Sequence, residues 1–327
     1  METIVKKDYL DDVLYSYRMS HIKDQTDAYK AAAGRLQKAV KEHYGDKIYD
    51  TFLSGSIAKH TAVNTKFDID FVIPFRHDSF ATLQEMSDDV YAFLDKYKSR
   101  KENIDICDSS VKKQKVSIGF EYRYFDNGVQ KTIPIDVVPG RELSQGDYEE
   151  TESLNLFFRD STWGFMSDEG SRQKTNIAAQ GAKICGKDNE RKMIRLLKIW
   201  KKANGKNVKS FVLELFVLKA LEDYDGAKDL WSLLQHTLQF IRDNATNESC
   251  HLYDPGNSNN DVLARMDKYE RSLLYGDMKN LLYCLENIEG YIKQAFPENS
   301  KFKRPKDTYG TNVGRQMPLP PDNRRFG

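Results

Sequence analysis

Residues 52–75 read FLSGSIAKHTAVNTKFDIDFVIPF, and their pattern decides the fold. The pair Gly55 and Ser56 interrupts one apolar segment, and Asp68 and Asp70 lie two positions apart inside the next. Residues two apart in a β-strand point to the same face, so both carboxylates face the same side. Two such carboxylates repel each other and lose solvation unless a positive charge lies beside them. The stretch therefore indicates a site that holds positive charge.

The residues on either side of this stretch predict an α+β fold with two lobes. Hydrophobic periodicity and a hairpin signal at Asp126-Asn127-Gly128 predict strands at 48–53, 67–75, 111–124 and 132–138. The same criteria predict helices at 3–44, 57–61 and 79–98. From about residue 165 onward the pattern is helical, with helices at 189–202, 210–224, 230–242 and 261–296.

These elements divide the chain into three parts. We expect a mixed-sheet lobe with an N-terminal helix over residues 1–165 and a helical lobe over 166–300. Residues 301–327 are rich in Pro, Gly and Arg and lack core-forming residues, which predicts a flexible tail.

Composition and charge exclude several classes of protein. The 327 residues carry 50 Lys and Arg against 49 Asp and Glu, so a large nucleic-acid-binding surface is not expected. The sequence has no run of 18 apolar residues and no apolar signal-peptide core, which predicts no membrane span and a cytoplasmic location. The four cysteines are far apart without CxxC spacing, and we interpret them as free thiols.

A third acid, Asp136, lies in the segment TIPIDVVPG, whose flanking Ile and Val residues predict a buried strand. Three carboxylates on one sheet face form a site for a hard divalent cation, since Mg²⁺ prefers oxygen ligands. Two such ions can bridge triphosphate oxygens and activate an attacking hydroxyl. A Gly-Ser pair before a helix suits a phosphate, because glycine lets the backbone approach and serine donates a hydrogen bond. Each feature alone also fits a solvated surface, whereas the combination favours nucleotide chemistry.

Together these motifs resemble the nucleotidyltransferase pattern of Gly-Ser, Asp-x-Asp and a distant third Asp. Residues 191–222, RKMIRLLKIWKKANGKNVKSFVLELFVLKALE, resemble the helical lobe of oligoadenylate synthetases and cyclic GMP-AMP synthase. Residues 254–262, DPGNSNNDV, are similar to a segment of their bacterial relatives, the CD-NTases of CBASS anti-phage systems. The resemblance covers about residues 45–265 and implies a polymerase-beta-like fold with the active site between the lobes.

The resemblance assigns a metal-binding triad to Asp68, Asp70 and Asp136, and it implies that the third acid also helps to deprotonate the attacking ribose hydroxyl. The implied cofactor is Mg²⁺, as two ions, with Mn²⁺ as an alternative. Gly55 and Ser56 correspond to the loop that holds the donor triphosphate.

Four residues of the helical half correspond to further nucleotide contacts. The resemblance implies that Lys198 contacts phosphates and that Arg195, one turn earlier, shares this role. Ser210 would contact phosphate, and Phe211 would stack on a nucleobase. The alternatives are solvated charges for Lys198 and Arg195 and a core position for Phe211, because FVLELFVL is apolar on several sides.

Two features near the Gly-Ser pair remain ambiguous in the sequence. Lys59 and His60 either line the cleft or lie on a surface helix, and the surface helix is the simpler expectation. Phe67 occupies the position before Asp-x-Asp where the family often has Ser, a difference that affects the loop and leaves both acids intact.

The function that the resemblance implies is condensation of ATP and a second NTP, such as GTP, into a cyclic oligonucleotide with release of pyrophosphate. The product would be an adenine-containing cyclic dinucleotide that turns on a downstream effector during phage infection. Two alternatives stay open. One is synthesis of linear oligoadenylate or nucleotidyl transfer to RNA or protein, and the other is an inactive nucleotide-binding interaction protein.

The end of the chain, PLPPDNRRFG, carries one further expectation. In some CBASS operons the C-terminal residue of the synthase is joined to a target by a ubiquitin-transfer-like enzyme, and Gly327 would be that residue here. The alternative is a frayed terminus without this role. Base choice, ring size and linkage are not encoded in any motif of the sequence.

Overall fold

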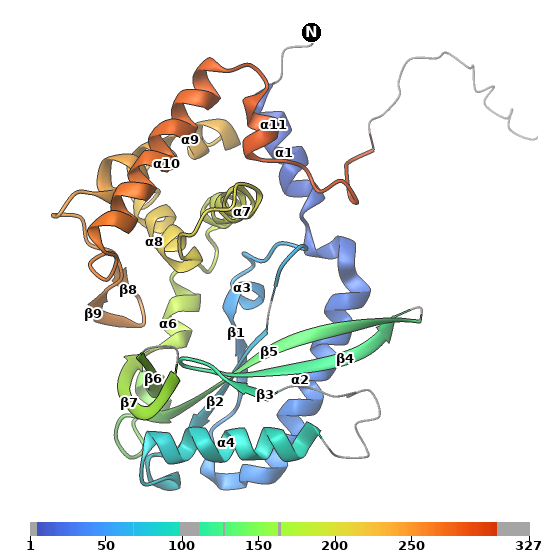
Figure 1. The fold of residues 1–327 in the computed structure, drawn as a ribbon, viewed down its shortest axis with the longest axis vertical. Helices are drawn as coiled ribbons and strands as arrows, with labels where there is room; N and C mark the ends of the chain where they lie inside the picture. The colour runs from blue at the N-terminus through green and yellow to red at the C-terminus, as the bar shows by residue number, and fades with distance from the viewer. Residues whose placement is uncertain (1–4, 68, 99–110, 127, 163–164, 306–327) are drawn as a thin grey trace, which may run out of the picture.

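The computed structural model describes residues 5–67, 69–98, 111–126, 128–162 and 165–305. The chain has two lobes, a mixed-sheet lobe in the lower half of Figure 1 and a helical lobe above it. The α+β, two-lobed fold predicted from the sequence is confirmed. Each helix in the described part of the chain is too short or too polar to traverse a lipid bilayer.

Within the described residues, one seven-stranded sheet organises the lower lobe. Its central path runs β1-β2-β5-β4-β3, and β6 pairs with both β5 and β7. The strands are β1 Phe52–Ser54, β2 Ile69–Phe75, β3 Val111–Lys113, β4 Ile118–Asp126, β5 Val129–Glu142, β6 Leu154–Thr162 and β7 Phe165–Thr175. Only β2 and β5 pair in parallel among the described strands, which brings two segments far apart in sequence side by side at the centre.

One face of the sheet is covered by helices α2, Lys23–Tyr44, and α4, Leu83–Lys98 (Figure 1). The core beneath them contains alternate residues of the central strands, such as Phe71 and Ile73 of β2 and Ile135 of β5. Because successive strand residues point to opposite faces, the residues between them face away from this core and towards the helical lobe. The functional residues of β2 and β5 lie on that second face.

The helical lobe is built around α8, Ser210–Ala220, whose side chains are buried on nearly all sides. Helices α7 Asp188–Ala203 and α9 Leu230–Ala245 pack against it, and the lobe also contains α6 Ile177–Ala182, α10 Lys268–Asn287 and α11 Tyr291–Ala295. A small hairpin of β8, Tyr253–Asp254, and β9, Asn257–Asp261, lies at the end of the lobe nearest β6 and β7 in Figure 1. The two shortest helices of the sheet lobe are α3 Gly55–Ala58 and α5 Tyr148–Thr151.

The N-terminal helix α1, Lys6–Ser16, packs in the helical lobe although it precedes the sheet in sequence. Its buried side chains Leu10, Val13 and Leu14 belong to the same core as α7 to α11. The end of the described chain also contacts it, since Arg304 forms an ion pair of 2.7 Å with Asp11. Residues 301–305, which the sequence placed in a flexible tail, thus include a contact with α1, and the rest of that tail lies outside the described residues.

Several predicted elements differ from the structure; for example, the strand predicted over 111–124 forms two strands, β3 and β4. The helix predicted over 3–44 is interrupted by a 3₁₀ turn at Met19–Ile22, so that α1 and α2 pack in different lobes. Residues 165–175 form β7 and not the predicted helix, because their ladder with β6 outweighs a sequence that has little apolar periodicity. The helix predicted from 261 begins at Lys268, where Asp267 and Glu270 form a capping box.

Candidate active site

Two of the three predicted acids lie side by side at the centre of the sheet. Asp70 of β2 is in register with Asp136 of β5, and Ser54 of β1 lies opposite Asp70 on the other side. In-register residues on neighbouring strands share a face, so both carboxylates point towards the helical lobe. The third predicted acid, Asp68, lies outside the described residues.

Gly55 packs directly against the side chain of Asp70. Its φ of +77° lies in the left-handed region, and a Cβ atom at this position would overlap the Oδ2 atom of Asp70. Glycine is therefore required both by the backbone and by the approach of the carboxylate. Ser56 follows at the start of α3, and its carbonyl oxygen accepts a hydrogen bond of 2.9 Å from the Thr61 backbone N–H. Phosphate binding by Gly55 and Ser56 stays a prediction.

Asp136 is oriented by a neighbouring loop. The Nε2 atom of Gln114 donates a 2.9 Å hydrogen bond to Asp136 Oδ1, and Ser117 Oγ donates to Gln114 Oε1 at 2.7 Å. The two in-register carboxylates supply the oxygen ligands that Mg²⁺ prefers, so these residues fit the implied ion. The described residues contain no group of three or more His, Cys, Asp or Glu that could hold a metal, and Asp68 would be the third member.

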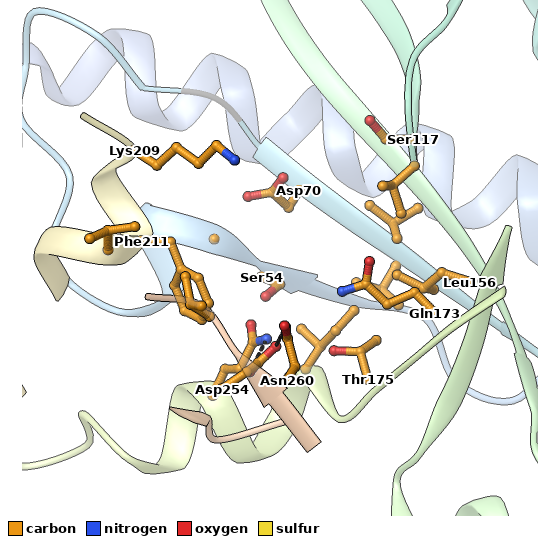
Figure 2. A pocket seen from close by; sticks show the side chains of 18 of the residues that line it. Ser54, Asp70, Ser117, Leu156, Gln173, Thr175, Lys209, Phe211, Asp254 and Asn260 are labelled. Carbon is orange, nitrogen blue, oxygen red and sulfur yellow. Dashed lines mark hydrogen bonds between the residues drawn. The ribbon is translucent and has the colours of Figure 1, made fainter. Parts of the chain in front are cut away.

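A cavity of about 490 Å³ lies between the lobes beside Asp70 (Figure 2). The sheet lobe contributes Ser54, Gly55, Lys59, Asp70, Val116 and Ser117 to its lining, and the helical lobe contributes Lys209, Phe211, Asp254, Asn260 and Arg265. The Lys209 side chain extends towards Asp70 in Figure 2. The cavity thus combines an acidic sheet face, cationic groups and an aromatic ring, which are the groups that a nucleotide and its counter-ion require.

The wall formed by the small hairpin is a buried polar network. Asp254 accepts hydrogen bonds from Gln180 Nε2 at 2.9 Å, from the Gly256 N–H at 2.8 Å and from Asn260 Nδ2 at 3.3 Å. Asn260 is 5% exposed, and its Oδ1 atom has no hydrogen-bond partner in the described part of the chain. The network fixes the hairpin against α6 and places polar groups beside the cavity.

Lys59 is buried in the cavity wall, which corrects the expectation of a surface helix. Its residue exposure is 8%, and its Nζ atom lies 2.7 Å from Oε1 of Glu214 on α8. The sequence could not show this pairing, because the partner lies 155 positions away. His60 has a φ of 57° and faces a different cavity, which Arg191 and Arg195 also line.

Lys198 and Arg195 occupy separate places. Lys198 Nζ donates hydrogen bonds to the carbonyl oxygen of Thr61 at 3.1 Å and to its Oγ1 at 3.0 Å, which ties α7 to the segment between α3 and β2. Arg195 lines the cavity next to His60, which is separate from the cavity beside Asp70. Burial and the nearby charge of Arg18 lower the pKa of Arg195. The structure therefore does not bring Arg195 together with the acids.

Ser210 begins α8 and accepts a 3.4 Å hydrogen bond from Lys201 Nζ. Burial and the charge of Lys66 lower the pKa of Lys201. Phe211 lines the cavity, and its ring also packs against the helical core. The nucleotide-binding roles of Lys198, Arg195, Ser210 and Phe211 stay predictions.

Sequence reasoning missed several residues of the cavity. Lys209, which lines the cavity, and Gln114, which contacts Asp136, lie in segments without a recognisable motif, NVKSF and KKQKVS. Asp254 and Asn260 lie within DPGNSNND, a segment that contributed to the resemblance without a role being assigned to its residues. The resemblance of that segment was the one feature of the sequence that could have pointed to Asp254 and Asn260.

Known structures share this fold. Escherichia coli MS115-1 CdnC, solved with ATP, aligns with a TM-score of 0.62 and 18% identity over 86% of this chain and 94% of its own. Elizabethkingia meningoseptica CdnE cyclic dinucleotide synthase, solved with GTP and Apcpp, aligns with a TM-score of 0.55 and 18% identity over 78% of this chain and 91% of its own. Another CdnC structure is a complex with HORMA-deltaN.

Vibrio cholerae DncV cyclic AMP-GMP synthase, described as a prokaryotic cGAS homolog, aligns with a TM-score of 0.55 and 16% identity, covering 86% of this chain and 78% of its own. No protein-family model and no curated protein matches the sequence. The structural likenesses establish that this chain has the fold of the CD-NTases, as its motifs indicated.

Proposed function

We propose that this protein is a nucleotidyltransferase that condenses ATP and a second NTP into a cyclic oligonucleotide, with release of pyrophosphate. The observation that carries the proposal is the in-register pair Asp70 and Asp136, of which Asp70 lines the cavity between the two lobes. The proposal is supported by the shared fold, because the similar structures include a cyclic dinucleotide synthase and a cyclic AMP-GMP synthase. An adenine-containing cyclic dinucleotide is the product that we propose.

Asp70 and Asp136, with Asp68, would hold Mg²⁺, as two ions or with Mn²⁺ in its place. When bound, the ions supply positive charge that neutralises the phosphate oxygens of the substrate. Asp136 accepts the proton of the attacking ribose hydroxyl, and Gln114 orients its carboxylate for this task. Lys209 lies on the opposite wall, where its ammonium group attracts the triphosphate. Phe211 offers a ring for base stacking.

The test is direct synthesis. The protein is incubated with the four NTPs and Mg²⁺, treated with phosphatase and assayed by mass spectrometry for a phosphatase-resistant product. Asp70→Asn and Asp136→Asn should each lower the rate by at least about 100-fold, because each removes one charged oxygen ligand while keeping the side-chain shape. Asp50→Asn is the matched control, because the Asp50 side chain is 96% exposed on the surface. Unchanged synthesis in both acid variants would sink the assignment.

The product distinguishes the alternatives from the main proposal. Linear oligoadenylate has free ends that phosphatase trims, and nucleotidyl transfer to RNA or protein labels a macromolecule. Tight NTP binding without turnover, across Mg²⁺ and Mn²⁺, would support an inactive nucleotide-binding protein. The presence of all three acids and of the Gly-Ser pair disfavours this last alternative.

We further propose a role in anti-phage signalling in the cytoplasm, in which the product turns on a cyclic-nucleotide-responsive effector. The complex of Escherichia coli MS115-1 CdnC with HORMA-deltaN supports the proposal that this chain also binds a partner protein. Conjugation at Gly327 by a ubiquitin-transfer-like enzyme remains part of this proposal, and the residue lies outside the described chain. Its test is deletion of Gly327 in cells that encode such a partner, where intracellular conjugates should disappear.

A further inference from the structure

We infer that the buried ion pair between Lys59 and Glu214 positions Phe211 and α3 across the cavity, and thereby sets the nucleobase relative to the acids. The inference rests on the proposed function and adds two positioning residues to it. Lys59 and Glu214 come from different lobes, since Lys59 directly follows α3 of the sheet lobe and Glu214 lies on α8 of the helical lobe.

The pair is short and excluded from solvent. Lys59 Nζ lies 2.7 Å from Glu214 Oε1, and the two side chains are 9% and 8% exposed. Removing two charges from water is costly, and replacing such a pair with apolar side chains is often neutral or stabilising. A buried pair at the edge of a ligand cavity is therefore better explained by the geometry that it fixes than by stability.

Phe211 shares this contact. It lies three positions before Glu214 on α8, so the two side chains project from the same side of the helix. Lys59 Nζ lies 5.4 Å from the centroid of the Phe211 ring, within the range of a cation–π interaction. One ammonium group thus holds both the carboxylate and the aromatic ring of the opposite lobe.

The same lysine is joined to the acids through the backbone. The Lys59 N–H donates a 3.1 Å hydrogen bond to the Gly55 carbonyl oxygen, and Gly55 packs against the Asp70 carboxylate. A continuous series of contacts therefore runs from Phe211 through Lys59 and Gly55 to Asp70. Displacement of α3 relative to α8 would change the distance between the stacked base and the acids at the same time.

The alternative role of Lys59, direct contact with phosphate, predicts a different effect of Glu214→Gln on nucleotide binding. If Lys59 were a direct phosphate ligand, Glu214 would compete with the substrate, and Glu214→Gln would leave nucleotide binding unchanged or strengthen it. If the pair positions Phe211, then Lys59→Met and Glu214→Gln cause the same defect, because either change breaks the pair.

The first measurement needs no substrate. 4-Fluorophenylalanine is placed at position 211 of the full chain, and its ¹⁹F resonance is recorded in the unchanged protein, in both single variants and in Lys59→Met/Glu214→Met. We expect one sharp resonance in the unchanged protein and a shifted or broadened one in each variant. If a single variant fails to fold, the spectrum of the double variant decides. The double variant should fold, because it removes both buried charges together and leaves neither unpaired. An identical resonance in the folded variants would overturn the inference.

The second measurement is steady-state kinetics of NTP condensation. Each single variant should raise the KM for NTP by about tenfold or more, and the double variant should be no worse than the poorer single variant, because coupled residues are non-additive. Lys183→Met and Glu222→Gln are the matched controls. Their ion pair also joins a lysine to a glutamate just past the end of α8 at 3.2 Å, but the side chains are 45% and 53% exposed.

The two measurements test the proposed function and the positioning role of the ion pair separately. Absence of any product in the unchanged protein counts against the proposed function, and the ¹⁹F spectra still decide whether the pair fixes Phe211. Additive KM effects, or a defect in Lys59→Met with normal KM in Glu214→Gln, would exclude the positioning role and favour phosphate contact.

Discussion

Asp70 and Gly55 pack so closely that the space of a side chain at position 55 is taken by the carboxylate of Asp70. The contact places the turn before α3 directly beside the sheet acids. A glycine at this place therefore has a measurable consequence for both folding and activity.

Gly55→Ala should abolish NTP condensation and lower the free energy of unfolding by about 1–3 kcal/mol, because it combines a positive φ with overlap of Asp70. Gly290→Ala is the matched control, since Gly290 has a φ of +75° with no atom within 4 Å of a Cβ. Chemical denaturation and product formation are measured for both variants. Equal effects of the two variants would mean that strain at φ, and not the Asp70 contact, explains the glycine.

Gln114→Glu should lower kcat by about tenfold or more, because it replaces the amide that donates to Asp136 with a second carboxylate. Ser117→Ala should have a smaller effect, since it removes the hydrogen bond that holds the far end of Gln114 and leaves the Asp136 contact intact. Both variants are compared at saturating NTP. A normal kcat in Gln114→Glu would show that the orientation of Asp136 by this loop does not matter.

Glu142→Gln should destabilise the sheet lobe by about 2–3 kcal/mol at neutral pH, because the buried carboxylate accepts hydrogen bonds from Tyr49 and from the His77, Gly146 and Tyr148 N–H groups. Burial alone would raise the pKa of Glu142, but these hydrogen bonds outweigh it and hold the pKa below its ordinary value of 4.5.

The pH dependence follows from this direction. A carboxyl group with a lowered pKa in the folded state stabilises the fold fully above its unfolded pKa, and this contribution is lost as the pH falls through the folded pKa. The difference in stability between the unchanged protein and Glu142→Gln should therefore shrink below about pH 4.5. Denaturation between pH 3 and pH 8 measures it, with the exposed Glu150→Gln as control, which should show no such trend.

Gly256→Ala should displace the β8–β9 hairpin from α6, because a Cβ would lie 2.5 Å from the Asn176 carbonyl oxygen. We expect a loss of about 1–3 kcal/mol in unfolding free energy and a raised KM for NTP, since Asp254 and Asn260 line the cavity from this hairpin. Gly181→Ala, on α6 with open space around its Cβ, should be neutral or slightly stabilising. Equal stability of both variants would contradict close packing of the hairpin.

The sequence predicted local features of the site and missed the contacts between distant segments. Apolar segments placed Asp70 and Asp136 on strands, but their shared register depends on a parallel pairing between β2 and β5 that no local pattern encodes. Phosphate binding at Gly55 stays a prediction, and the close approach of the Asp70 carboxylate to this glycine could not be predicted from the sequence. Lys59 was expected on the surface because no nearby residue offers it a buried partner. Its partner Glu214 lies on α8, whose sequence is otherwise almost entirely apolar.

The secondary structure likewise divides into elements that local sequence predicted and elements that depend on distant contacts. Helices with strong periodicity, such as α7 and α9, were predicted close to their observed bounds. The strand β7 was not, because FMSDEGSRQKT has no strand pattern and its pairing with β6 supplies the order. A chain segment whose structure depends on its neighbour cannot be recognised from its own residues.

The placement of α1 has a consequence for how the molecule assembles. Leu10, Val13 and Leu14 are synthesised before the whole sheet, yet they are buried only when α7 to α11 are in place, and Tyr9 donates a 2.9 Å hydrogen bond to the Phe296 carbonyl oxygen. Contacts of such large sequence separation form late, because a long loop must close first. Helix α1 therefore lacks its core partners until α7 to α11 have been synthesised, and its apolar face is open to aggregation until then.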